Sequence, residues 1–356
     1  MQPDARDVGR FEQLPKWLNL VPMVLQWMWL GLRHRSFTLP SAVNPGITSG
    51  GLVGEGKMEY FAAMGETARA ATAAHVAIVA SEQRGLPHLL GRMQGAGLDF
   101  PVVAKPDIGW CGYGVRLLHT PQELADYAHR FPADADFVLQ RYLPEPGEAG
   151  LFYMRHPDEA SGRLIGILLR DYPVVVGNGR DSISTLVSKD ARIQRGSADP
   201  MHEISYDRER IPLAGEQVRL STVASTRVGG RYRDGSVLAT SALLSAVDGV
   251  AKDMGDIATQ PFLVGRFDVR YRDEASLQRG DFTIMEVNGA GSEAVHAWDP
   301  KYRIRDVYRI VFAKQQKLFQ IGAEQRRLGH RPIGIMALAR LYWRQQQLIA
   351  RYPASN

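Results

Sequence analysis

Three oxygen-bearing side chains in the C-terminal half of the chain could hold a divalent cation. Asp268 alternates with Phe267 and Val269 in one apolar segment, while Glu286 and Asn288 stand two residues apart in the next. If both segments are strands of a hairpin, residues two apart share a face and the three side chains can meet. Carboxylate and amide oxygens are the ligands that Mg²⁺ selects. The spacing therefore predicts a Mg²⁺ site, with a surface hairpin of paired charges as the alternative.

A lysine followed by a glycine-rich loop could bind phosphate groups. Lys105 ends the apolar segment PVVAKP, and Gly109, Gly112 and Gly114 follow in the sequence DIGWCGYGV. Glycines let backbone N–H groups approach phosphate oxygens closely, and a lysine ammonium can contact the same oxygens. The pattern is neither a P-loop nor a dinucleotide fingerprint, because the lysine precedes the loop and a strand at 115–118 follows it. The alternative is an ordinary turn between two strands.

A strand and a loop after residue 136 could bind a nucleoside. The segment FVLQRYL at 137–143 is typical of a strand, and it leads into the loop PEPGEAGLFYMRHP. Main-chain groups at such an edge can hydrogen-bond an adenine, with Gln140 near its amino group and the loop residue Glu148 near ribose hydroxyls. A solvated loop carboxylate is the alternative for Glu148. Arg170 lies in the middle of a further expected strand at 162–176.

The order of these features resembles that of ATP-grasp enzymes from about residue 100 to residue 300. GRFDVRY and MEVNGAGSEAVHAWDP are similar to segments of D-alanine–D-alanine ligases, and VVVGNGRDSISTLV is similar to a segment of cyanophycin synthetases. The resemblance implies an α+β fold in which two lobes clamp ATP. The resemblance implies that Lys105 contacts the α- and β-phosphates and that the loop Gly109–Gly114 closes over them as a lid. It implies adenine contacts from Gln140, Tyr142 and Leu143 and a ribose contact from Glu148. It also implies that one or two Mg²⁺ ions, which Mn²⁺ can replace, are bound by Asp268, Glu286 and Asn288.

The reaction that the resemblance implies joins a carboxylic acid to an amine. ATP would phosphorylate the carboxylate, and the amine would attack the acyl phosphate to form an amide. Arg266 would stabilise the acyl phosphate and the oxyanion, assisted by Arg170 and by backbone N–H groups around Gly291 and Ser292. A small-molecule kinase with the same ATP site and a non-catalytic nucleotide-binding, membrane-associated protein are the alternatives.

The sequence departs from the D-alanine ligase pattern at three positions. Arg170 stands where those enzymes have a lysine, Ser292 where they have a glycine, and Ala297 where they have a serine for the acceptor carboxylate. We therefore do not expect D-alanine dipeptide synthesis. Residues 44–57, 227–233 and 293–296 are candidates for the substrate pocket, and the identity of the acid and the amine stays open.

Composition places the protein in a reducing compartment and favours anionic ligands. The chain has 356 residues, 45% of them apolar and 23% charged, and a single cysteine, which excludes a disulfide framework. A net charge of +5 suits nucleotides or a negatively charged membrane surface. No nucleic-acid module is recognisable. Because Asp4, Asp7 and Glu12 precede the first apolar run, we expect no export signal and a cytoplasmic protein.

Four regions follow from these features. They are a helical and loop region at 1–75, a nucleotide lobe at 76–180, a catalytic lobe at 181–310 and C-terminal helices at 311–356.

Residues 17–35 are expected to form an apolar helix that is rich in tryptophan and has one polar stripe. They comprise the run WLNLVPMVLQWMWLGL and the residues that follow it. It suits the inner face of a membrane, a partner subunit such as a second copy, or the protein's own core. Pro22 weakens a continuous interfacial helix and favours packing on protein.

Overall fold

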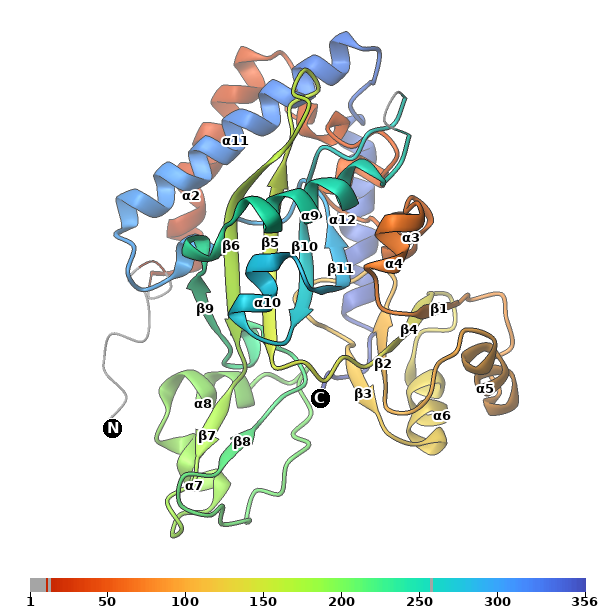
Figure 1. Cartoon of the computed structure of the whole chain (residues 1–356), viewed down its shortest axis with the longest axis vertical. Helices are drawn as coiled ribbons and strands as arrows, with labels where there is room; N and C mark the ends of the chain where they lie inside the picture. The colour runs from red at the N-terminus through yellow and green to blue at the C-terminus, as the bar shows by residue number, and fades with distance from the viewer. Residues whose placement is uncertain (1–10, 12–13, 257–258) are drawn as a thin grey trace.

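The computed structural model describes residue 11, residues 14–256 and residues 259–356. Asp4, Asp7 and Glu12 lie outside this description. Two antiparallel sheets and the helices around them build the molecule, so the predicted α+β class is confirmed (Figure 1). A third, two-stranded sheet projects from the second of them.

The first sheet carries the lysine and the glycine-rich loop. Its strand order is β1-β4-β2-β3, formed by His75–Ile78, Phe137–Arg141, Val102–Pro106 and Arg116–Leu118. Two helices, α5 (Leu86–Gly95) and α6 (Pro121–Arg130), share its apolar core. The hydroxyl of Thr120 accepts a hydrogen bond from the Glu123 backbone N–H and so caps α6, as the sequence predicts.

The second sheet separates a core face from a polar face. Its strand order is β11-β10-β5-β6-β9, formed by Thr283–Asn288, Val264–Tyr271, Gly147–Met154, Arg163–Asp171 and Arg231–Asp234. Phe267 and Val269 on β10 pack into the largest core, together with side chains from α3 (Lys57–Ala62), α4 (Glu66–Ala70), α9 (Ser241–Lys252) and α10 (Glu274–Arg279). Since side chains alternate along a strand, Arg266, Asp268 and Arg270 point to the opposite face.

Two sequence expectations differ from the structure. The expected strand 162–176 is two strands, because β6 ends before Pro173 and β7 (Val174–Val176) pairs with β8 (Gln217–Arg219) instead. Glu148 lies in β5 and not in a loop.

The division between the two main sheets falls in the connection from β4 to β5, residues 142–146. The predicted boundary between 180 and 181 does not coincide with it. The small sheet carries α7 (Ile183–Ser188), which is capped by Ser182, and α8 (Ala191–Ser197). Short 3-10 turns complete the connections, at Leu39–Ala42, Thr48–Gly51, Thr226–Val228, Ser236–Leu238 and Val295–Trp298.

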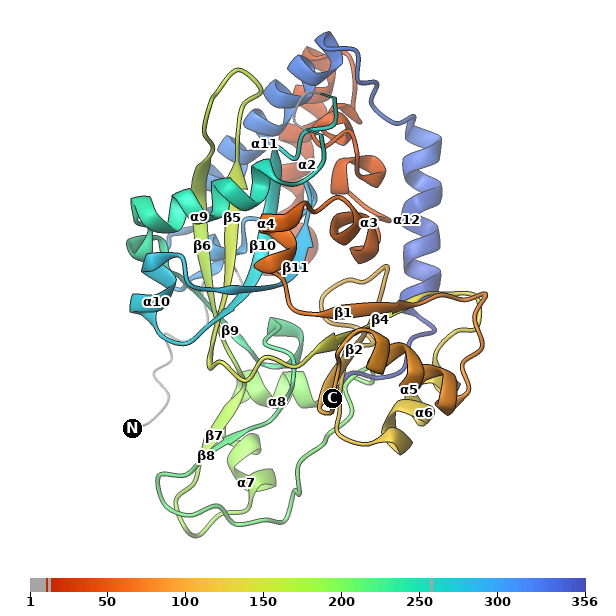
Figure 2. The ribbon, with the colours of Figure 1, turned by 45° about the vertical axis from the view of Figure 1, so that its right-hand side comes forward.

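Three long helices lie outside the sheets. Helix α2 (Lys16–Arg33) runs beside α11 (Ile304–Arg327), and α12 (Ile335–Ile349) follows after a break near Gly329, as the sequence predicts (Figures 1 and 2). Across the described residues, the longest apolar stretches in helices are too short or too polar to cross a bilayer.

The residues after α12 return to the first sheet. Leu348, Ile349 and Tyr352 belong to its core, where the Tyr352 ring stacks on Phe131 with 5.2 Å between the ring centroids. The side chain of Asn356 donates to the carbonyl of Leu117 over 3.1 Å and accepts from the N–H of the same residue over 3.0 Å. The C-terminal tail is thus part of the structure around β3.

Candidate functional site

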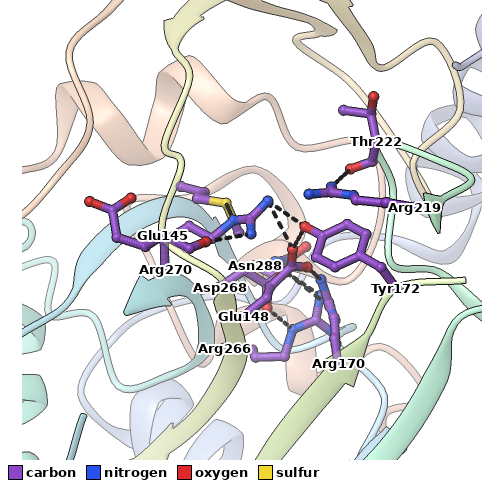
Figure 3. A network of polar contacts seen from close by, with 11 residues as sticks. Glu145, Glu148, Arg170, Tyr172, Arg219, Thr222, Arg266, Asp268, Arg270 and Asn288 are labelled. Carbon is purple, nitrogen blue, oxygen red and sulfur yellow. Dashed lines mark hydrogen bonds and ion pairs between the residues drawn. The ribbon is translucent and has the colours of Figure 1, made fainter. Parts of the chain in front are cut away.

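Two buried carboxylates form the centre of the polar face of the second sheet. Asp268 on β10 accepts hydrogen bonds from Arg266 Nε at 2.6 Å and Nη2 at 2.8 Å. Arg170 on β6 joins this pair to Glu148 on β5, with 3.0 Å to Glu148 and 3.2 Å to Asp268 (Figure 3). The site therefore brings together Arg170, Arg266, Asp268 and Glu148, which the sequence reading places in the active site.

The sheet register explains why these side chains meet. Asp268 is paired with Gly150 of β5 on one side and with Glu286 of β11 on the other, and Arg266 is paired with Asn288. A Cβ atom at Gly150 would lie 2.9 Å from Arg266 Cδ and 3.0 Å from Asp268 Oδ1. Gly150 thus leaves the room in which the Arg266–Asp268 ion pair fits.

Two further residues complete this network. Arg270 is buried, donates to the Glu145 carbonyl over 3.0 Å and lies 3.6 Å from Glu148 Oε2. The Tyr172 hydroxyl contacts Arg270 and Glu148, and burial raises the pKa of Tyr172 above its usual value. The sequence reading assigned no role to either. The alternation that placed Arg266 and Asp268 on one face also predicts Arg270 there, whereas nothing in the local sequence indicates Tyr172.

A second group of charges faces the network from the first sheet and from α3. Lys105 is buried and donates to Gln140 Oε1 at 2.8 Å and to the Met285 carbonyl at 2.7 Å, and burial lowers the pKa of Lys105 to about 8. Lys57 lies 3.1 Å from Glu286. Although burial raises the pKa of Glu286, the ammonium groups of Lys57 and Lys105 outweigh it and hold that pKa below the usual value.

Cations are concentrated in this site. Five of them, Lys57, Lys105, Arg170, Arg266 and Arg270, face the carboxylates of Glu148, Asp268 and Glu286. Asp107 also lies near the two lysines, and Glu55 lies near Lys57. Guanidinium and ammonium groups gathered in this way can bind an anion with several charges. A polyphosphate supplies such an anion and matches the planar guanidinium groups.

Asp268, Glu286 and Asn288 fit a magnesium ion by donor type. Asp268 and Glu286 stand directly opposite each other on paired strands, and the Asn288 amide donates to Asp268 over 3.2 Å. The side chain of Glu286 is 31% exposed, so a ligand can reach it. Among the residues that the structure describes, no three His, Cys, Asp or Glu side chains form a metal-binding group, which leaves the set at two carboxylates and one amide.

The connection between the two sheets holds buried polar atoms with open bonding capacity. In the described part of the chain, Gln140 Nε2 and Glu145 Oε2 are buried and have no hydrogen-bond partner. Leu143 is buried and Tyr142 half-buried beside them. Buried polar groups are nearly always satisfied in folded proteins. A ligand with acceptor and donor groups, such as a nucleoside, would satisfy both atoms.

Glu148 is less available than the sequence reading expects. One of its oxygens accepts from Arg170, and the other faces Tyr172 and Arg270. A contact with ribose would require one of these partners to move. Glu145, which lies in the connection itself, keeps a buried oxygen free.

The glycine-rich loop has the backbone that its glycines allow. Gly112 and Gly114 adopt φ angles of 75° and 72°, which residues with side chains rarely adopt. A Cβ at Gly109 would lie 2.7 Å from Lys57 Nζ, so this glycine lets the loop pass close to that ammonium. Arg227 donates to the Cys111 carbonyl over 3.3 Å and to the Gly112 carbonyl over 3.4 Å. Arg227 therefore holds the loop and is not a free anion-binding group.

The amides of Gly291 and Ser292 are not open to an oxyanion. The Gly291 N–H donates to the Gly51 carbonyl over 2.7 Å, and the Ser292 N–H donates to the Gly289 carbonyl over 3.1 Å. In this conformation the turn at Gly50–Gly51 engages the Gly291 N–H and the Gly289 carbonyl engages the Ser292 N–H, so their role as oxyanion donors stays a prediction that requires these bonds to open.

Lys314 on α11 lies behind this turn and was not found from the sequence. Its ammonium contacts the Ser292 carbonyl and lies 3.5 Å from the Ala290 carbonyl. Burial, together with repulsion from Arg266, lowers the pKa of Lys314 to about 7. Lys314 follows this loop by roughly 20 residues in the chain, and nothing in the local sequence of α11 predicts that the helix packs against the loop.

Comparisons with known proteins give structural likenesses only. No family model matches the sequence, and no curated protein matches it. The chain is similar to the D-alanine–D-alanine ligase of Bacillus anthracis (15% identity, 80% of this chain, 71% of that chain, TM-score 0.43) and to the same enzyme with ATP (14%, 80%, 69%, TM-score 0.40). It is also similar to a bifunctional glutathione synthetase of Pasteurella multocida (16%, 72% of this chain, TM-score 0.35), of which it spans 36%.

Proposed function

We propose that this protein is an ATP- and Mg²⁺-dependent ligase of ATP-grasp type that joins a carboxylic acid to an amine. The observation that carries the proposal is the concentration of guanidinium and ammonium groups around three carboxylates on the polar face of the second sheet, opposite Lys105. A cluster of this kind is suited to a nucleoside triphosphate, whose phosphates accept hydrogen bonds from such cations and whose Mg²⁺ is held by carboxylates.

The nucleotide lies between the two sheets. Lys105 binds phosphate oxygens, and the loop Gly109–Gly114 covers them with backbone N–H groups. The unpaired Nε2 of Gln140, with Tyr142 and Leu143, receives the adenine. Glu145 binds the ribose, with Glu148 as the second candidate for this contact.

Asp268, Glu286 and Asn288 would hold Mg²⁺, which would supply positive charge to neutralise the phosphates. Arg266 and Arg170 bind the transferred phosphoryl group and the acyl phosphate that forms on the substrate carboxylate. The neutral form of the substrate amine then attacks the acyl carbon and phosphate leaves. The amine gives up its proton to solvent as the amide forms.

A small-molecule kinase is the second candidate. It is favoured by the engagement of the Gly291 and Ser292 amides, which leaves the acceptor side without the backbone donors that a tetrahedral intermediate would use. Such an enzyme would stop after phosphoryl transfer.

The first experiment measures phosphate and ADP release over a matrix of carboxylic acids and amines, followed by mass spectrometry of the products. Glu286→Gln should lower turnover by about 100-fold or more, because the variant lacks one of the two carboxylates that would hold the Mg²⁺ that neutralises phosphate charge. Binding of Mn²⁺ in the presence of ATP, measured by electron paramagnetic resonance, should weaken in the same variant. Asp281→Asn, at a surface pair with Arg279, is the matched control and should keep both properties.

Two outcomes would contradict the proposal. If folded Glu286→Gln protein keeps full turnover and Mn²⁺ affinity, Glu286 is not a metal ligand. If a phosphorylated product accumulates and no amide forms with any amine, the kinase replaces the ligase.

A further inference from the structure

Helix α2 turns its apolar side chains away from the protein. Nine large apolar residues of this helix are exposed, and the exposed fraction is 67% for Trp17, 64% for Leu25 and 67% for Leu32. The others are Leu18, Leu20, Val21, Val24, Met28 and Trp29. A helix on the surface of a globular protein normally buries this face. A contiguous apolar surface of this kind marks an interaction site.

The polar stripe of α2 is the side that contacts the protein. Asn19 is buried and donates to the Phe11 carbonyl over 2.7 Å. Gln26 donates to the Phe312 carbonyl of α11 over 2.9 Å, and Gln315 of α11 donates back to Met23 over 3.3 Å. Trp27 and Leu30 pack beside this stripe, so the expected packing on the protein's own core holds for this side of the helix and does not hold for the nine exposed residues.

A second helix extends the apolar surface. Helix α12 stands at the right edge of the molecule in Figure 2 and exposes Ile335, Met336, Tyr342 and Trp343. Between it and the C-terminal half of α2 lies a hollow of about 400 Å³, lined by Trp27, Phe37, Leu52, Val53 and residues of α12. We call the exposed residues of α2 and α12, with this hollow, the apolar face.

The segments that form the apolar face carry no acidic residue. Residues 14–54 contain three Lys or Arg and residues 325–356 contain six, and neither segment contains Asp or Glu. The rest of the chain therefore holds 34 basic residues against 38 acidic ones. Arg33, Arg35, Arg340 and Arg344 are exposed, and the guanidinium of Arg33 lies 5.3 Å from the centre of the Trp29 ring.

We propose that the apolar face is a docking surface for an anionic lipid bilayer, on which α2 lies in the plane of the interface. Exposed tryptophans and leucines enter the boundary between headgroups and acyl chains, and the arginines contact anionic headgroups. A second copy of the chain fits the charges less well. A symmetric pairing of two such faces would bring arginines together without one carboxylate to balance them.

The experiment is flotation of the full-length protein with vesicles. Wild-type protein should float with phosphatidylcholine vesicles that contain roughly 30% phosphatidylglycerol, and remain in solution with pure phosphatidylcholine. Leu25→Glu combined with Leu32→Glu should lower the bound fraction about tenfold or more, since it places charge in the apolar boundary. Leu213→Glu combined with Val237→Glu is the matched control, because both residues are exposed and lie outside α2 and α12. Arg340→Gln combined with Arg344→Gln should weaken binding and its dependence on salt.

Thermal melting of each variant, followed by circular dichroism, establishes that it is folded. The proposal fails if wild-type protein does not float with the anionic vesicles, or if the Leu25 and Leu32 variant floats equally well. It also fails if light scattering shows a dimer that this variant separates, because the face then belongs to a second copy. Neither failure affects the proposed reaction, whose test needs no membrane.

Discussion

The polar site and the apolar face both reverse the usual distribution of residues, in opposite directions. On the second sheet, Glu148, Asp268 and Arg270 are charged and buried. On α2, Trp17, Leu25 and Leu32 are apolar and exposed. Charged groups are seldom buried unless they are paired, and large apolar groups are seldom clustered on a surface without a partner.

The difference lies in where each region finds its partners. The buried charges are paired with one another through the sheet register, so the fold itself depends on them. On α2, Asn19 and Gln26 bond to the protein and Leu30 packs beside them, whereas the exposed apolar residues lie on the outer side of the helix. Mutations should therefore affect folding strongly in the first region and weakly in the second.

The largest effect is expected for Asp268→Asn. This change leaves Arg266 and Arg170 without their buried counter-charge, and it should lower the free energy of unfolding by about 3–5 kcal/mol and abolish ADP formation. Urea unfolding measures the free energy of unfolding, and a coupled assay measures ADP formation. Asp171→Asn, at the exposed pair with Arg233, is the control and should cost about 1 kcal/mol or less. If both variants lose the same free energy of unfolding, burial of the Asp268 network does not contribute to stability.

A smaller effect separates the two sides of α2. Leu30→Ala on the inner side, where Leu30 is 2% exposed, should lower the free energy of unfolding by about 2–5 kcal/mol. Leu25→Ala on the outer side should change it by about 0.5 kcal/mol or less. Both values come from urea unfolding of the two single variants. A large loss for Leu25→Ala in the isolated protein would show that its side chain packs inside the fold.

The smallest effect concerns pH. Burial lowers the pKa of Lys105 to about 8, so its ammonium is present below that pH and is lost above it. The dissociation constant for ATP should rise up to about fivefold between pH 8 and pH 9, because one phosphate contact loses its charge. Lys105→Arg should flatten this dependence, since arginine stays charged. Titration calorimetry measures the dissociation constant for ATP at each pH in both proteins. If this constant does not change with pH in the wild-type protein, Lys105 does not contact the phosphates.

A second lysine provides the control for this experiment. The pKa of Lys314 is lowered to about 7 by burial and by Arg266, so it titrates about one unit lower. Lys314→Met should therefore leave the change between pH 8 and pH 9 intact.

Local periodicity was enough to predict the elements that hold most of the site. The alternation in GRFDVRY and MEVN places Asp268, Glu286 and Asn288 on one face, and the register confirms that Asp268 and Glu286 are paired. The Thr120 cap and the bounds of α6 also follow from neighbouring residues. These features depend on interactions over a few residues, which the sequence contains in full.

The remaining features depend on distant segments. Glu148 follows two prolines and a glycine, so its sequence resembles a loop, yet pairing with β10 and β6 makes it part of a strand. The turn at Gly50–Gly51 blocks the Gly291 amide from the other end of the chain. For α2, periodicity identifies the polar stripe and cannot tell which side the protein will contact.

The return of the C-terminal tail to the first sheet affects how the protein is made. Residues 75–141 contain every strand of that sheet, but Leu348, Ile349 and Tyr352 complete its core. During synthesis these three residues leave the ribosome roughly 200 residues after the last strand of the sheet. Until these residues have been synthesised, the first sheet carries an incomplete apolar core, and we expect chaperones to bind the nascent chain at this stage.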